Sequence, residues 1–185
     1  MRYLIAAAAC LTVLPQSASA QNNGAPSAAD KDRMIANAMS AAPASLSSKA
    51  KVMLMDGTVL REGTNGWTCI PDDPAEPNNA PVCLDDTWLA FFDAYMNKKQ
   101  PKVERMGIAY MLQSDMPVSN TDPYATAPTP DNQWLQVGVP HLMIVMPTGQ
   151  SLDGVSSDPH NGGPWVMWKG TPYAHIMVPS EPRMK

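Results

Sequence analysis

Two short stretches of the chain repeat a pattern of histidine, one aliphatic residue and methionine: HLMIV at 141–145 and HIMVP at 175–179. Side chains two positions apart in a β-strand project from the same face of a sheet, so each stretch would present an imidazole beside a thioether. Thioether sulfur combined with imidazole nitrogen suits copper. If the two strands are neighbours, the sequence predicts a copper site formed by His141, Met143, His175 and Met177.

This H-x-M spacing resembles the ligand pattern of the small periplasmic copper chaperones, whose ligands are histidine and methionine on a β-scaffold. The resemblance covers these two residue pairs and implies copper as the bound cofactor. A structural alternative stays open, because the chain contains 14 methionines and methionine fills gaps in hydrophobic cores well. The repeat can also mark two similar core strands that hold no ligand.

The third histidine lies in a glycine-rich segment, DPHNGGP, at 158–164. Loops often carry binding and catalytic groups, so His160 with the carboxylates of Asp158 and Asp122 forms a second hypothesis, acid–base chemistry in an enzyme of hydrolase type. The alternative is a plain turn, since Asp, Pro, Asn and Gly are the usual turn residues. The sequence has no G-x-S-x-G, H-E-x-x-H or G-x-x-x-x-G-K motif that would indicate a particular reaction.

The first 20 residues have the pattern of a secretory signal peptide: a basic start at Arg2, an apolar run, and a small-residue end at Ala18, Ser19 and Ala20. We therefore expect residues 1–20 to be removed and residues 21–27 to form a flexible leader. No segment contains the roughly 20 apolar residues of a membrane-spanning helix. The sequence predicts a periplasmic or secreted protein without a membrane span.

Removal of the signal peptide takes away Cys10 and leaves Cys69 and Cys83. A cysteine pair in an exported protein is read first as a disulfide. The alternative, a redox or metal pair, requires a close C-x-x-C spacing or further ligands nearby, and neither is present. The predicted disulfide closes the 15-residue segment CIPDDPAEPNNAPVC.

The charge of the chain is mildly acidic, with 17 Asp and Glu against 13 Lys and Arg. No cluster of basic residues is present, which argues against nucleic acid and anionic membrane surfaces as partners. The partners expected from the sequence are a small ligand or another envelope protein.

Apolar periodicity predicts an α+β fold in which an antiparallel sheet packs against one or two helices. A helix is expected between Ser27 and Pro43, and another should begin at Asp85 or Asp86. A hairpin is expected around the turn dipeptide Asp56-Gly57. The remaining strand patterns are NGWTCIP, GIAYMLQ, LQVGVPHLMIVMP, PWVMWKG and PYAHIMVP.

Residues 28–185 are expected to form a single domain, since this length suffices for one hydrophobic core. Within it, residues 114–133 form a long polar connection that contains four prolines. Connections of this length inside a compact domain are often functional or disordered.

The segments NGWTC, SNTDPYA and WKGTPYAHIMVP, together with Cys83, resemble a group of small exported bacterial proteins of uncharacterised function. The resemblance covers residues 51–179 and implies an exported protein, but it supplies no activity. The sequence alone therefore predicts an exported small binding protein of unknown ligand. The more specific hypothesis is that this ligand is copper. The alternatives are a periplasmic enzyme of hydrolase type and a structural envelope protein without a small-molecule site.

Overall fold

The structure is a computed structural model that describes residues 27–136 and 138–180. The predicted signal peptide, residues 1–20, lies outside the described residues. The predicted flexible leader, residues 21–27, also lies outside them except for Ser27, which caps the first helix.

The structure confirms both predicted helices and adds a short one. Helix α1 (Ala28–Met39) begins where the Ser27 hydroxyl accepts a hydrogen bond from the Asp30 backbone N–H at 3.2 Å. It ends before the expected limit at Pro43, at the C-cap residue Ser40, whose hydroxyl donates a hydrogen bond to the Asn37 carbonyl at 2.7 Å. Helix α2 (Ala44–Ser47) follows directly after Pro43.

Helix α3 (Asp86–Met96) begins at Asp85, whose carboxylate accepts a hydrogen bond from the Trp88 backbone N–H at 2.7 Å. This cap satisfies one of the free N–H groups of the first turn. Gly107 faces that turn from the sheet, where a Cβ atom would come within 2.9 Å of Thr87 and of Val145. Glycine at this position therefore lets α3 lie directly on the sheet.

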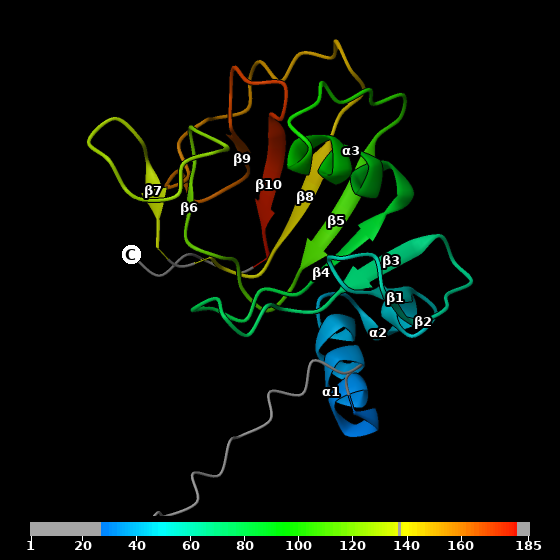
Figure 1. Ribbon diagram of the computed structural model, residues 1–185. Coiled ribbons are helices and arrows are strands. Elements are labelled where there is room, and N and C mark those ends of the chain that lie inside the picture. Colours follow the sequence, from blue (N-terminus) through cyan, green and yellow to red (C-terminus); the bar gives the residue numbers. More distant parts are fainter. Residues whose placement is uncertain (1–26, 137, 181–185) are drawn as a thin grey trace, which may run out of the picture.

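The main sheet has eight strands in the order β2-β1-β3-β4-β5-β8-β10-β9 (Figure 1). Neighbouring strands are antiparallel except β1 and β3, which are parallel. The predicted α+β class is therefore confirmed. The strands are β1 (Lys51–Met53), β2 (Val59–Arg61), β3 (Trp67–Ile70), β4 (Val82–Asp85), β5 (Gly107–Met111), β8 (His141–Val145), β9 (Trp165–Met167) and β10 (His175–Pro179).

The long polar connection predicted at 114–133 contains part of a second, two-stranded sheet. It is formed by β6 (Val118–Ser119) and β7 (Trp134–Leu135), which lie beside β9 in Figure 1. We call β6, β7 and the loop between them the arm. Asn120 fixes the arm to β9, because its side-chain oxygen accepts a hydrogen bond from Trp165 Nε1 (3.0 Å) and its carbonyl accepts one from the Trp168 N–H (2.8 Å).

Two hydrophobic clusters lie on opposite faces of the main sheet. The first includes Trp88 and Phe91 of α3 together with Leu84 and Met177 of the sheet. The second packs α1 and its C-terminal neighbours against the other face. Cys69 and Cys83, which belong to the second cluster, are opposite each other on β3 and β4 and form the predicted disulfide.

Candidate functional site

The structure places both H-x-M pairs on neighbouring strands and on one face of the sheet. Met143 of β8 lies directly opposite Met177 of β10. The strands are antiparallel, however, so His141 lies opposite Pro179, four positions along β10 from His175. This offset corresponds to roughly 13 Å along the strand direction. The ladder thus brings the two methionines together and holds the two histidines at opposite ends.

Within residues 27–136 and 138–180, no group of three or more His, Cys, Asp and Glu side chains is placed to hold a metal ion. A copper site that includes methionine sulfur would use a different set of ligands. Copper binding by the H-x-M residues therefore stays a prediction.

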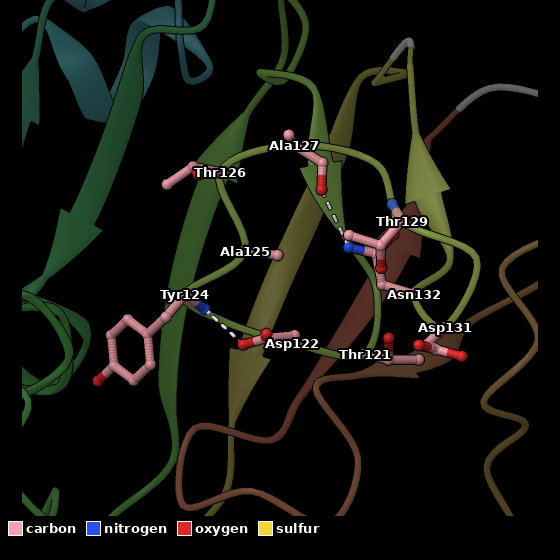
Figure 2. Close-up of a pocket in the computed structure, with 9 residues that line it drawn as sticks. All are labelled: Thr121, Asp122, Tyr124, Ala125, Thr126, Ala127, Thr129, Asp131 and Asn132. Atoms are coloured by element: carbon pink, nitrogen blue, oxygen red, sulfur yellow. Dashed lines mark hydrogen bonds between the residues drawn. The ribbon is translucent and has the colours of Figure 1, made fainter.

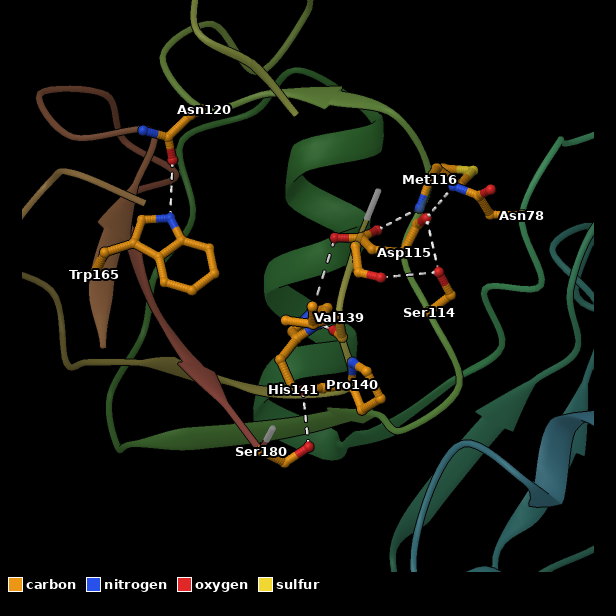
Figure 3. A network of polar contacts seen from close by, with 11 residues as sticks. Asn78, Ser114, Asp115, Met116, Asn120, Val139, Pro140, His141, Trp165 and Ser180 are labelled. Atoms are coloured by element: carbon orange, nitrogen blue, oxygen red, sulfur yellow. Dashed lines mark hydrogen bonds and ion pairs between the residues drawn. The ribbon is translucent and has the colours of Figure 1, made fainter. Parts of the chain in front are cut away.

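His141 occupies a polar network at one end of the sheet (Figure 3). It is buried, its Nδ1 lies 2.6 Å from the Val139 carbonyl oxygen, and its Nε2 lies 3.8 Å from the Asp115 carboxylate. The Asp115 carbonyl in turn accepts a hydrogen bond from the Asn78 side chain at 2.9 Å. The network therefore ties the β3–β4 loop, the connection after β5 and the start of β8 to one another.

His160, the histidine of the enzyme hypothesis, is exposed in the loop between β8 and β9. The Asp158 carboxylate accepts a hydrogen bond from the His160 backbone N–H at 2.8 Å, the arrangement expected of a turn. Asp122 belongs to the arm, where it lines a small cavity of about 340 Å³ with Asp131 (Figure 2). His160 lines neither this cavity nor the larger one described next.

A cleft of about 1290 Å³ lies over the face of the sheet that α3 covers. Because residues paired across strands share a face, the register places every sheet residue of the cleft floor on this one face. These floor residues are Ile70, Val82, Leu84, Met111, Met143, Met167 and His175.

The walls of the cleft come from α3, the arm with the segment just before it, the β3–β4 loop, the β1–β2 turn and α1. The lining contains six aromatic residues: Trp88, Phe91, Phe92, Tyr95, Trp134 and Trp168. It also contains six methionines: Met34, Met55, Met111, Met116, Met143 and Met167. Aromatic rings supply large, rigid apolar surfaces, and methionine supplies a flexible one that adapts to irregular shapes.

Trp168 forms part of the wall in a strained backbone conformation. Its φ angle is 54°, in the left-handed region that bulky residues rarely adopt. The arm holds it there, since its indole N–H donates to the Ser119 carbonyl (2.8 Å) and its backbone N–H donates to the Asn120 carbonyl (2.8 Å). Backbone strain of this kind is found disproportionately at binding sites. The fold therefore maintains an unfavourable conformation at the cleft wall.

His175 lies at the floor of the cleft and is 2% exposed. Its Nδ1 lies 2.9 Å from the Tyr173 carbonyl oxygen, which can only accept, so Nδ1 carries the hydrogen and Nε2 presents a lone pair. Nε2 is buried and has no hydrogen-bond partner among the described residues. Burial lowers the pKa of His175 to about 4, so the ring is neutral at pH 7.

This pKa predicts that the protein loses stability in mild acid. Above pH 6.5 His175 is neutral in both the folded and the unfolded chain, so it does not change the free energy of unfolding with pH. Below it, the unfolded chain binds a proton that the folded protein does not bind until about pH 4. The free energy of unfolding should therefore fall by roughly 3 kcal/mol between these pH values.

Urea denaturation at pH 7, 5.5 and 4.5 measures the free energy of unfolding of the wild type and of His175→Phe, and so tests the predicted loss of stability in acid. Carboxylates titrate in both proteins, so the difference between the two profiles isolates the contribution of His175. Identical pH profiles for the wild type and His175→Phe would contradict the prediction.

The rim of the cleft is acidic. Its described lining includes Asp72, Asp73, Glu76 and Asp115, together with Asp30, which forms an ion pair with Arg33 of α1. Arg33 is the one basic residue of that lining. The rim therefore favours neutral or cationic molecules over anionic ones.

Sequence reasoning placed Met143 and His175 on one face of the sheet but missed most of the cleft. Trp88, Phe92 and Tyr95 recur at near-helical spacing in the sequence, and such an apolar stripe by itself indicates only core packing. Met167 and Trp168 also line the cleft, and a turn follows them in the chain. No local sequence pattern predicts that these two residues line a cavity.

The fold and the cleft together define an α+β protein in which a mostly antiparallel sheet, helix α3 on its face and a hydrogen-bonded arm enclose an apolar cleft. Comparison with known protein families, curated proteins and solved structures gives no match for this chain. None of the helices in the described part of the chain has the length and apolar character that crossing a membrane requires.

Proposed function

We propose that the protein binds a small, apolar, largely aromatic molecule in the cleft over the α3 face of the sheet. The observation that carries this proposal is the lining, in which six aromatic residues and six methionines surround about 1290 Å³. Ligand sites are typically concave and mostly apolar, with a few polar groups that fix orientation. Here those polar groups are His175 at the floor and the carboxylates at the rim.

The size and lining of the cleft favour ligand binding over a structural role. Its volume exceeds the roughly 300–1,000 Å³ of usual small-molecule sites, which indicates room for an extended ligand. Methionine-rich surfaces adapt their shape and are common where several related molecules are bound. The ligand is therefore an apolar class rather than a single rigid compound.

The lining also favours binding over hydrolysis. Among the described residues that line the cleft there is neither a serine nor a cysteine, the two nucleophiles that most often pair with a histidine. The catalytic candidate His160 lies outside the cleft. We therefore place ligand binding ahead of the hydrolase hypothesis.

The location that we propose for this activity is the periplasm or the medium. Two features support it: the signal-peptide pattern of residues 1–20 and the disulfide between Cys69 and Cys83, which is typical of oxidising compartments. A binding protein in this location would meet apolar molecules that enter or leave the cell.

The test uses N-phenyl-1-naphthylamine, a neutral aromatic probe whose fluorescence rises in apolar surroundings. We expect a saturable increase with one probe per protein. Met143→Thr should weaken binding about fivefold, since it removes apolar contact area from the floor. Ile144→Thr is the matched control, because Ile144 is the next residue of the same strand, is also half-buried, and points to the opposite face.

Both substitutions place threonine, a good strand residue, in β8, so their effects on the strand itself should be similar. A probe signal that does not saturate, or an equal loss of affinity in both variants, would refute binding in the cleft.

A further inference from the structure

The feature that the proposed function does not use is the lone pair on Nε2 of His175. The residue is in β10, which lies between β8 and β9 (Figure 1), and it pairs with Met167 of β9. Nδ1 is committed to the Tyr173 carbonyl, while Nε2 has no hydrogen-bond partner among the described residues. A buried acceptor without a donor is costly, and native proteins rarely leave one unpaired.

The surroundings of the ring keep Nε2 from finding a protein donor. Three aromatic rings contact the imidazole edge to face, with centroid distances of 5.3 Å for Trp88, 6.2 Å for Phe91 and 5.1 Å for Trp168. The indole N–H groups of both tryptophans are already used, by the Met143 and Ser119 carbonyls. The packing thus fixes the ring and leaves its acceptor without a donor from these rings.

The walls beside His175 can yield to a ligand. Met167 lies opposite it on β9, and Met143 lies on β8 next to β10; both also line the cleft. Methionine has several rotatable bonds and changes shape at low cost. A ligand in the cleft can therefore approach the floor beside the imidazole by displacing thioether side chains rather than backbone.

We propose that the ligand of the cleft donates a hydrogen bond from an O–H or N–H group to Nε2 of His175. The ligand class is then an apolar aromatic molecule with a donor group, such as a phenol or an aromatic amine. This inference rests on the proposed function, since it names the polar group of the molecule that the cleft binds. Molecules that carry only acceptors, and pure hydrocarbons, are disfavoured because they leave Nε2 unpaired.

A matched pair of probes tests the inference: 1-naphthol, which has an O–H donor, and 1-methoxynaphthalene, which has the same rings and no donor. Their dissociation constants are measured by calorimetry at pH 7 with EDTA present, which keeps metal ions from Nε2. The quantity compared is the ratio of the two constants in each protein. The difference in water solubility of the probes cancels when this ratio is compared between variants.

In the wild type we expect 1-naphthol to be favoured, and His175→Phe should reduce this preference about tenfold, as expected for the loss of a hydrogen bond to a buried acceptor. His141→Phe is the control, because it removes another buried histidine of the same sheet face that does not line the cleft. It should leave the preference unchanged.

A second measurement on the wild type does not depend on any variant folding. The ¹⁵N resonance of His175 Nε2 should shift upfield on addition of 1-naphthol and stay in place with 1-methoxynaphthalene.

The outcomes separate the two proposals. If neither probe binds the wild type, the proposed function fails. If both bind, but the preference for 1-naphthol is the same in His175→Phe and the Nε2 resonance does not respond, the cleft binds apolar molecules and the donor inference is overturned.

Discussion

Replacing Trp88 by alanine is expected to lower the free energy of unfolding by about 3–5 kcal/mol, the range for deleting a large buried aromatic side chain. Trp88 is 3% exposed and lies between α3 and the sheet. Its ring centroid lies 4.9 Å from that of Phe91 and 5.3 Å from that of His175. Its indole N–H donates a hydrogen bond to the Met143 carbonyl at 3.0 Å. Its removal therefore takes away packing and a hydrogen bond together.

Thermal unfolding followed by circular dichroism measures this effect. For a chain of this size the expected loss corresponds to a decrease in melting temperature of roughly 6–20 °C. Trp88→Phe retains an aromatic ring and should show a much smaller loss, about 1 kcal/mol from the missing indole N–H.

Trp134→Ala is the comparison that separates stability from binding. Trp134 lines the same cleft from the arm, but it is only half-buried. Its replacement should change the free energy of unfolding by no more than about 1 kcal/mol and still weaken binding of N-phenyl-1-naphthylamine. Equal losses of stability in Trp88→Ala and Trp134→Ala would show that Trp88 does not anchor α3 to the sheet.

Removal of the disulfide by Cys69→Ala with Cys83→Ala should destabilise the protein by about 4 kcal/mol. Chain entropy accounts for roughly 3 kcal/mol of this for a loop of this length, and the loss of two buried sulfur atoms for about 1 kcal/mol more. Both cysteines are fully buried in the cluster beneath α1. The bridge closes a loop that carries Asp72 and Asp73, part of the acidic rim.

Urea denaturation of the wild type with and without dithiothreitol measures the same quantity without a substitution. The reduced wild type should lose most of the stability that the double variant loses, and dithiothreitol should have no effect on the double variant. If reduction leaves the stability of the wild type unchanged, the loop does not depend on its bridge.

The rim should retain part of its order in the reduced protein, because α1 also holds the loop. The Asn37 side-chain oxygen accepts a hydrogen bond from the Asp72 backbone N–H at 2.8 Å, and its amide donates to Asn79 at 2.7 Å. Affinity for a neutral probe at the floor should therefore decrease less than stability does.

Segments that are far apart in the sequence together form the cleft. Its floor is the sheet face, one wall is α3, and another is the arm that Asn120 pins to β9. The disulfide loop and α1 complete the rim. The long polar connection at 114–133, which the sequence marked as functional or disordered, thus contributes to the wall of the proposed binding site.

Several features of the fold were determined by the sequence itself, because their causes are local. Ser27 and Asp85 cap helices through their own side chains, and Asp56-Gly57 makes a turn between adjacent strands. The period-two pattern of HLMIV and HIMVP places each histidine and methionine on one face of a strand whatever the strand pairs with. The pairing of Cys69 with Cys83 followed from there being two cysteines in the predicted mature chain.

Only the tertiary structure decided how these pieces meet. The antiparallel pairing of β8 with β10 sets Met143 opposite Met177 and places His141 and His175 at opposite ends, and this register depends on packing between distant segments. The same packing makes β1 parallel to β3 and holds Trp168 in a strained conformation. The cleft has no local signature, because it is the space that α3, the arm and the sheet leave between them when they pack. The sequence therefore contains the residues of the candidate site, whereas the long-range packing of the folded chain decides which of them face the same cleft.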